Sequence, residues 1–287
     1  MTQVTNPTQP ASSLSGGVGG GGFTVVGIEG QNRLNGGTGS DIIVTFGGAD
    51  AIAGGSGNEL IISGGGNDSV GGGDGNDTVI SGSGSDVVAG GTGDDFIFGG
   101  KGDDLVDGGD GNDLISGDRG NDTVLGGSGS DTVFGGQGND VVSGGDGNDS
   151  LFGGKDNDTV NGGSGNDFIS GDRGSDVLTG GAGSDTFYFF SSGGDYGVDT
   201  ITDFTPGEDK IRLKQGGVFA GLGSTFEASE FVVVSGFNTA TPGTATTNKL
   251  VYDQTTGVLY FNGSNGVLTI AQLSSNPVIS ANNFELF

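Results

Sequence analysis

The stretch Gly126-Gly127-Ser128-Gly129-Ser130-Asp131-Thr132-Val133-Phe134 decides the fold of this chain, because it is one unit of a repeat. Units of nine residues follow one another without insertion or deletion from Gly36 to Tyr188, which makes 17 units in 153 residues. The sixth position is Asp in 16 units, and the eighth is Ile, Val, Leu or Phe in all 17. A period this short and regular predicts a solenoid built from stacked turns.

Each position of the unit has a structural task. Positions one to five are expected to turn the chain, which favours residues that accept positive φ, and glycine predominates at positions one, two and four. Positions seven to nine are expected to form a short strand whose central, apolar residue points inward. Two units then make one coil of 18 residues, and coils stack as parallel strands about 4.8 Å apart. The expected fold is all-β: a right-handed parallel β-roll of about eight and a half coils, followed by a C-terminal all-β extension.

The composition indicates that a cation has to enter this fold. The 287 residues include 68 Gly, only 31% are hydrophobic, and the formal net charge is −27. Glycine raises the entropy lost on folding, and charge repulsion opposes a compact state. The chain has no Cys and no His, so zinc, iron–sulfur and haem sites lack their usual ligands, as do Ser–His and Cys–His catalysis. Only 9 Lys and Arg are present, which argues against nucleic acid as a partner.

The sixth-position carboxylates are the candidate metal ligands, because stacking places them in register along both edges of the roll. Calcium accepts six to eight oxygen ligands in irregular geometry, whereas magnesium requires a tight octahedron. The 17 units contain 26 acidic and 4 basic residues, a charge that roughly a dozen or more calcium ions would neutralise. The alternative is a turn-forming role without metal. The predicted ligands are Asp41, Asp50, Asp68, Asp77, Asp86, Asp95, Asp104, Asp113, Asp122, Asp131, Asp140, Asp149, Asp158, Asp167, Asp176 and Asp185.

These units resemble the G-G-x-G-x-D-x-U-x repeats of the RTX (repeats-in-toxin), or hemolysin-type, calcium-binding proteins, and the resemblance covers all 17 units. It implies that each ion lies between turns of adjacent coils, held by sixth-position carboxylates and loop carbonyls. Departures from the pattern put individual sites in doubt at Thr45-Phe46, Glu59 and Asp156. The pairs Asp94/Asp95 and Asp103/Asp104 fall at positions five and six, so a ligand beside an exposed charge is favoured over a glycosidase pair.

The two sides of the roll are expected to differ, because odd and even units contribute their strands to opposite sheets. The odd side carries large apolar residues at positions seven and nine, such as Ile42, Phe96 and Phe134, whereas the even side is mostly small or polar. The odd sheet is therefore expected to be covered, by the C-terminal region or by a surface partner or second copy. Charge at position three also segregates: Lys and Arg lie only in even units, and Asp lies only in odd ones.

The predicted domain organisation has three parts. Residues 1–26 are expected to form a flexible Gly/Ser/Pro-rich tail, 27–188 the roll, and 189–287 a β-rich C-terminal region. Residues 27–35 read as a cap with Asn32 at the acidic position. The C-terminal region predicts strands at 199–204, 209–213, 231–234, 250–252, 258–261 and 267–270. The segment 199–213 resembles the one that follows the repeats in RTX proteases, and Asp199, Asp203 and Asp209 are a candidate further ion site, against turn and cap roles.

Export is predicted from both ends of the chain. The N-terminus lacks the basic and apolar regions of a cleaved signal peptide, and no stretch is apolar enough to predict a membrane span. The sequence ends Asn283-Phe284-Glu285-Leu286-Phe287, which is similar to the C-terminal signal of type I secretion substrates. The expected partner during export is therefore a type I (ABC) secretion apparatus, and the expected location is extracellular, secreted or attached to the cell surface.

The predicted function is that of a secreted, non-enzymatic protein that folds on binding extracellular Ca²⁺ and has a structural role at the cell surface or in a matrix. Two alternatives remain. The chain could be an accessory module of an extracellular hydrolase or epimerase system, although only 35 residues precede the first unit. It could also resemble an RTX cytotoxin, although no apolar pore-forming region is present.

Overall fold

The computed structural model describes residues 3–4, 12–15, 22–190, 197–214, 219, 222, 226–237, 239–240, 248–263 and 266–287. These residues form strands and short 3₁₀ turns but no α-helix. Within them, no helix has the length and apolar character that crossing a membrane requires. The chain divides into two compact units, Met1–Leu151 and Phe152–Phe287, and the predicted domain boundary after residue 188 stays a prediction. A coil contacts only its neighbours, so a long repeat can be divided within the array.

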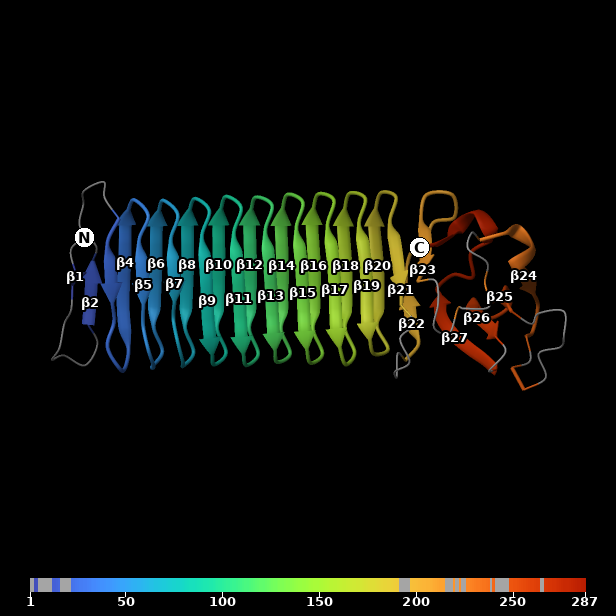
Figure 1. The fold of residues 1–287 in the computed structure, drawn as a ribbon, viewed down its shortest axis with the longest axis horizontal. Helices are drawn as coiled ribbons and strands as arrows, with labels where there is room; N and C mark the ends of the chain where they lie inside the picture. The colour runs from blue at the N-terminus through green and yellow to red at the C-terminus, as the bar shows by residue number, and fades with distance from the viewer. Residues whose placement is uncertain are drawn as a thin grey trace. The chain divides into compact units, whose positions relative to one another are not determined.

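The first unit consists of two parallel sheets between which successive strands alternate (Figure 1). The sheet of the odd units has the order β1-β3-β5-β7-β9-β11-β13-β15, and the sheet of the even units has the order β2-β4-β6-β8-β10-β12-β14-β16. The strands are β1 (Gln3–Val4), β2 (Ser12–Ser15), β3 (Thr24–Val26), β4 (Asn32–Thr38), β5 (Ile42–Val44), β6 (Ala51–Ser56), β7 (Leu60–Ile62), β8 (Ser69–Asp74), β9 (Thr78–Ser83), β10 (Val87–Thr92), β11 (Phe96–Lys101), β12 (Leu105–Asp110), β13 (Leu114–Arg119), β14 (Thr123–Ser128), β15 (Thr132–Gln137) and β16 (Val141–Asp146).

The register confirms that two units make one coil. In the pairing of β11 with β13, Phe96 lies opposite Leu114 and Ile97 opposite Ile115, an offset of 18 residues. The eighth position points inward in every unit, and its side chains form the core. These residues are Ile43, Ile52, Ile61, Val70, Val79, Val88, Ile97, Val106, Ile115, Val124, Val133, Val142, Leu151, Val160, Ile169, Leu178 and Phe187. The predicted all-β parallel roll is therefore confirmed.

Most strands are longer than predicted. They cover positions seven to nine and continue through positions one to three of the next unit, as in β14 (Thr123–Ser128). Gly127 lies within this strand at φ 116°, and Gly129 at φ 137° begins the turn. Glycine at these positions lets the backbone bend while it still pairs with the next coil, since positive φ costs glycine little. The prediction that positions one to five all form the turn was wrong for this reason.

Paired strands also begin before residue 27, within the stretch predicted as a flexible tail. Strand β1 pairs in parallel with β3, and β2 with β4. Val25 and Leu34 are buried as the eighth-position residues are. An apolar residue flanked by backbone that can pair is sufficient for a strand to join the stack, even without the glycine-rich turn of the repeat.

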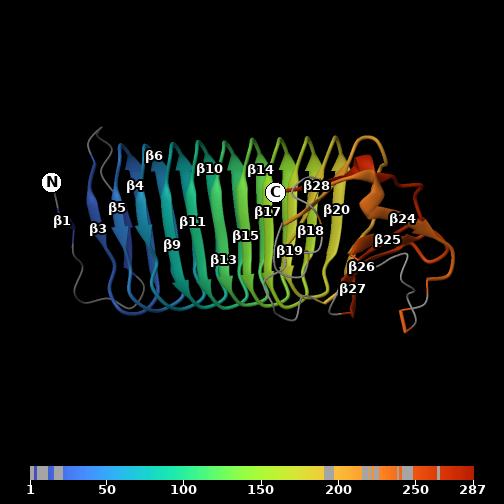
Figure 2. The same ribbon diagram turned by 45° about the vertical axis from the view of Figure 1, so that its right-hand side comes forward.

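The second unit contains the last repeats and the C-terminal strands (Figure 2). Strands β18, β20, β22 and β27 pair in parallel, as do β19, β21, β23 and β28, whereas β25, β26 and β27 pair antiparallel. The bounds are β18 (Thr159–Ser164), β19 (Phe168–Arg173), β20 (Val177–Ala182), β21 (Thr186–Phe189), β22 (Asp199–Ile201), β23 (Lys210–Leu213), β24 (Phe231–Val234), β25 (Lys249–Asp253), β26 (Val258–Gly263), β27 (Gly266–Leu273) and β28 (Phe284–Leu286); β17 (Ser150–Lys155) overlaps both units. All six strands predicted after residue 189 are present, although the first ends at Ile201 rather than at residue 204.

Candidate calcium ladders

The predicted ligands lie in two rows, one at each edge of the roll, because position six directly precedes a strand. All 16 Asp side chains are buried, with at most 3% of each exposed. In the first unit, the even edge holds the sixth-position residues of the even repeats, and the odd edge holds those of the odd repeats. The even edge comprises Asp50, Asp68, Asp86, Asp104, Asp122 and Asp140, and the odd edge comprises Asp41, Glu59, Asp77, Asp95, Asp113, Asp131 and Asp149.

In most of these Asp residues, one carboxylate oxygen is used to join adjacent coils. The Asp86 N–H donates to Asp104 Oδ1 at 2.8 Å, and the Asp104 N–H donates to Asp122 Oδ1 at 2.8 Å. The odd edge has the same bond from the Asp95 N–H to Asp113 Oδ1 at 2.8 Å. These bonds hold each carboxyl group in one orientation, so that its second oxygen points to a constant place in every coil.

The second oxygen, Oδ2, is buried and lacks a hydrogen-bond donor among the described residues in many of these Asp. Such an oxygen is costly to bury unless a cation or a proton accompanies it. Glu59 presents the same situation with both of its carboxylate oxygens. The Asp residues whose Oδ2 is in this state include Asp41, Asp50, Asp68, Asp77, Asp95, Asp104, Asp113, Asp122, Asp131 and Asp176.

The space beside Oδ2 is lined by oxygen from two coils. A methyl group added to Gly126 would lie 2.5 Å from Asp131 Oδ2 and 2.5 Å from the carbonyl oxygen of Gly144 in the next coil. A carboxylate oxygen and a carbonyl oxygen therefore converge on a small gap that only glycine at position one leaves open. Oxygen acceptors that converge without a donor fit a hard cation such as Ca²⁺. No three carboxyl groups meet at one point among the described residues, so backbone carbonyls have to complete each ligand set.

The pKa values of these carboxyl groups agree with a site built for a cation. Burial raises the pKa of Asp95 and of Asp104 to about 7, although backbone N–H donors oppose the shift. Burial raises the pKa of Glu59 to about 8, with a further contribution from the nearby Asp77. A divalent ion would favour the charged forms and reverse these shifts.

The structure adds two carboxylates to the ladders that the repeat frame did not predict as members. The Asp176 N–H donates to Asp199 Oδ1 at 3.0 Å, and the Asp185 N–H donates to Asp209 Oδ1 at 3.0 Å. These bonds span 23 and 24 residues instead of 18, so inserted residues hide the repeat. The signal is the motif of Asp, any residue and Ile, which occurs as Asp199-Thr200-Ile201 and Asp209-Lys210-Ile211.

Asp199, Asp203 and Asp209, the candidate further ion site, have different partners and do not meet at one point. Asp199 follows Asp176 in its row and Asp209 follows Asp185 in the other row. Asp203 accepts hydrogen bonds from the backbone N–H groups of Gly180 at 2.9 Å and Gly181 at 2.8 Å. Its carboxylate caps the end of strand β20, which is the cap role that the sequence left open.

Glu59 and Asp156, two of the departures from the repeat pattern, have different consequences for the ladder. Glu59 keeps only part of the ladder: its side chain is buried and its N–H donates to Asp77 Oδ1 at 2.8 Å, but neither of its carboxylate oxygens has a hydrogen-bond donor among the described residues. Asp156 replaces the position-four glycine, has φ 76° and is exposed, so it serves the turn and not the ladder.

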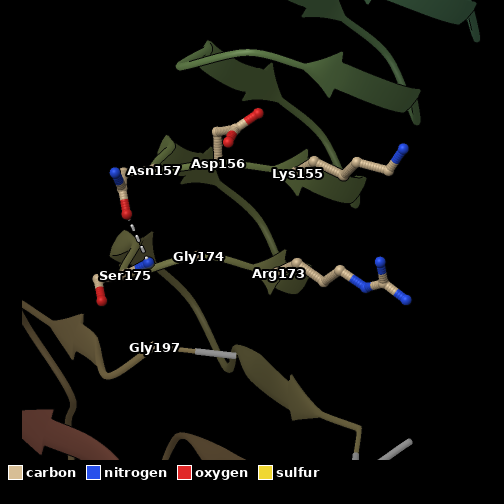
Figure 3. Close-up of a pocket in the computed structure, with 7 residues that line it drawn as sticks. All are labelled: Lys155, Asp156, Asn157, Arg173, Gly174, Ser175 and Gly197. Atoms are coloured by element: carbon tan, nitrogen blue, oxygen red, sulfur yellow. Dashed lines mark hydrogen bonds between the residues drawn. The ribbon is translucent and has the colours of Figure 1, made fainter. Parts of the chain in front are cut away.

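The segregation of charge at position three is confirmed. Lys101 lies opposite Arg119 at the ends of β11 and β13, whereas Asp74 and Asp110 flank Thr92 on the other sheet. In the second unit, Lys155 and Arg173 line a pocket of about 390 Å³ with Asp156, Asn157, Gly174, Ser175 and Gly197. Figure 3 shows both basic side chains extending in the same direction, away from Asn157 and Ser175.

The apolar odd side is only partly covered. In the first unit, Ile42, Phe96 and Phe134 are 40%, 49% and 38% exposed. In the second unit, the Tyr188 ring packs against Phe168 and against the C-terminal Phe287, with ring centroids 4.9 Å and 4.4 Å apart. Cover by the C-terminal region is thus confirmed at Tyr188, and cover of the first unit by a partner stays a prediction.

Comparison with known proteins agrees with the ladder geometry. The model of the RTX calcium-binding nonapeptide repeat (4 copies) matches residues 26–58, 53–88, 80–115, 89–124, 125–160 and 161–189. No curated protein matches the chain, whereas 34 chains of solved structures do.

Two of these structures are the AlgE6R3 subunit of the Azotobacter vinelandii mannuronan C5-epimerase and the extracellular lipase LipA from Serratia marcescens. The AlgE6R3 match has 25% identity and a TM-score of 0.31, and it covers 60% of this chain and 77% of that one. The LipA match has 20% identity and a TM-score of 0.23, and it covers 81% of this chain but only 40% of the lipase. Superpositions this partial carry no functional argument.

Proposed function

Because this chain belongs to the RTX calcium-binding nonapeptide repeat family, and its repeats form a Ca²⁺-binding β-roll, we propose that it is a secreted structural protein that folds when it binds extracellular calcium. The observation that carries the proposal is the row of buried Oδ2 atoms, most of which lie beside a carbonyl of the next coil where position one is glycine. A folded roll without cations would have to bury these oxygens unpaired or protonated.

The proposed mechanism couples binding to folding. At low free calcium the carboxylates repel one another, and the net charge of −27 favours an expanded chain. Extracellular calcium modules bind at about 10⁻⁴–10⁻³ M, so millimolar calcium outside the cell fills the sites. Each bound ion stabilises the folded state by mass action.

The proposal also covers export and role. A type I secretion apparatus would export the expanded chain, which is supported by the similarity of residues 283–287 to such signals. A non-enzymatic role in a surface layer or matrix is supported by the share of the chain devoted to repeats, 153 of 287 residues. The exposed apolar residues of the odd sheet, Phe96 and Phe134 among them, offer a surface for such an assembly.

The test is a calcium titration followed by circular dichroism. We expect little β-structure in chelator and a cooperative gain of β-signal as calcium rises to 10 mM. An unchanged β-signal over that range would contradict the proposal. Fractionating the producing cells into medium, surface and interior tests the location, and protein confined to the interior would contradict export. Assays of the purified protein for hydrolase and epimerase activity test the non-enzymatic role.

A further inference from the structure

Three units have a residue other than glycine at position one, and these units follow one another along the even edge. These residues are Thr45, Ser63 and Ser81, in the second, fourth and sixth units. Each lies one coil from the next along the even edge, since the units alternate between edges. Glycine occupies position one in the other 14 units, including Gly36, Gly54 and Gly72 on the odd edge.

The side chains at these positions are buried hydroxyl groups that donate to oxygen atoms of the ladder. Thr45 Oγ1 donates to the carbonyl of Ser63, and Ser63 Oγ donates to the carbonyl of Ser81 at 2.7 Å. Ser81 Oγ donates instead to Asp86 Oδ2 at 2.5 Å. None of the three side chains is more than 1% exposed. Each hydroxyl therefore uses one oxygen of the pair that converges on the gap elsewhere.

On the same edge, the coils that have glycine at position one show how little room there is beside the Asp Oδ2 atom. A methyl group on Gly117 would lie 2.5 Å from Asp122 Oδ2 and 2.7 Å from the carbonyl oxygen of Gly135. Real Cβ atoms do not approach other atoms this closely, so a side chain at position one cannot share this gap as it stands. A hydroxyl group fills the gap and supplies a proton where the glycine coils leave two oxygens facing each other.

The coil before these three uses an amide in the same way. Asn32 replaces the sixth-position Asp, and its Nδ2 donates to the carbonyls of Ile28 at 2.8 Å and Gly30 at 2.7 Å. The same group donates to Asp50 Oδ1 at 2.9 Å. The first four coils of the even edge thus contain four protein donors in the places where other coils present only oxygen acceptors.

We infer that the even edge takes up no calcium at Asp50, Asp68 and Asp86, and that its calcium ladder begins at Asp104. At Asp86 the Ser81 hydroxyl replaces the cation directly. At Asp50 and Asp68 the hydroxyl takes the carbonyl that would be the second ligand, so the buried Oδ2 of each is accompanied by a proton and not by a cation. This inference rests on the proposed calcium-dependent folding, and it makes the first coils calcium-bound along the odd edge alone.

The test counts bound ions by isothermal titration calorimetry on the full chain. We expect the triple variant T45G/S63G/S81G to bind more calcium than the wild type, by up to three ions, because glycine reopens the gaps. An unchanged or smaller number would overturn the inference, since the hydroxyl groups would then be neutral to binding or calcium ligands themselves. A wild type that binds no calcium would instead refute the proposed function.

A second pair of variants separates the sites without changing the backbone. Asp86→Asn and Asp104→Asn both keep the Oδ1 acceptor of the ladder, so both are expected to fold in saturating calcium. We expect Asp104→Asn to lose at least one ion and Asp86→Asn to lose none. Equal losses in the two variants would overturn the inference.

Discussion

At the scale of single residues, the roll depends on glycine, which has no side chain, as much as on the carboxylate of Asp. Where positions one and two are glycine, they lie so close to carbonyl groups of neighbouring coils that an added methyl group would overlap them, as at Gly126 and Gly127. The sixth position needs a side chain that is short, charged and held from both sides. Asp satisfies this requirement because Oδ1 joins the coils and Oδ2 stays available to a cation.

Gly127→Ala tests the close approach of coils. Gly127 has φ 116°, and an added Cβ would overlap the carbonyl of Gly109. We expect a loss of at least about 2 kcal/mol in the free energy of unfolding, because strain and overlap add. Urea unfolding in saturating calcium measures it. Gly71→Ala is the matched control, since nothing lies within 4 Å of its added Cβ; equal losses in both variants would contradict the argument.

The raised pKa values predict how pH acts on the calcium-free chain. Burial raises the pKa of Asp122 and of Asp131 to about 6, and that of Asp95 to about 7. A carboxyl group with a raised pKa in the folded state stabilises the fold fully below its unfolded pKa of about 4. That stability is lost as the pH rises through the folded pKa.

In chelator, we therefore expect more β-structure near pH 4 than at pH 8, with the loss centred at about pH 6–7. The same protons compete with calcium, so calcium affinity is expected to fall as the pH drops from 8 to 5. Circular dichroism in chelator and calorimetry at several pH values measure these effects. A β-signal in chelator that rises with pH would contradict the prediction.

At the scale of elements, each strand contributes a single inward residue, and its neighbours in the stack make up the rest of the core. Ile97 of β11 lies between Val79 of β9 and Ile115 of β13 in the sheet, and none of the three is exposed. A gap at one level therefore leaves the strands on both sides without a packing partner.

Ile97→Ala is expected to cost about 2–5 kcal/mol of unfolding free energy, because it leaves a cavity in a core that is one residue wide per strand. Phe96→Ala is the control, since that side chain is 49% exposed on the same strand. Thermal and urea unfolding in saturating calcium compare the two. A larger loss for Phe96→Ala would indicate that the outer face, rather than the inner row, carries the packing energy.

At the scale of the whole molecule, one physical process determines whether the chain is folded. The formal charge of −27 is distributed along repeats whose coils contact only their neighbours. An ion bound between two coils also favours binding at the next site, because it fixes a turn whose oxygen atoms line both sites. Folding should therefore be steep in calcium concentration, and it should depend on the kind of ion.

We expect the calcium titration to have a Hill coefficient well above 1, and 10 mM magnesium to leave the chain largely unfolded. Magnesium holds its water and requires a regular octahedron, whereas these gaps present carbonyl and carboxylate oxygens in irregular geometry. Circular dichroism with either ion makes the comparison. Equal folding by magnesium would mean that charge neutralisation alone, without specific ligation, drives the transition.

The sequence by itself determined the coil, the inward row and most of the ladders, because an uninterrupted nine-residue period forces every turn to repeat the one before. Asp131 and Val133 could be assigned from one unit, and the assignment held for all 17. Only the tertiary structure placed Asp199 and Asp209 in the same rows, since hydrogen bonds between coils do not depend on how many residues the connecting loop contains. It also decided the role of Thr45, Ser63 and Ser81. Ser and Thr are common in turns, so the sequence alone does not reveal this role. The role follows from the oxygen atoms that lie beside each hydroxyl group in the folded roll.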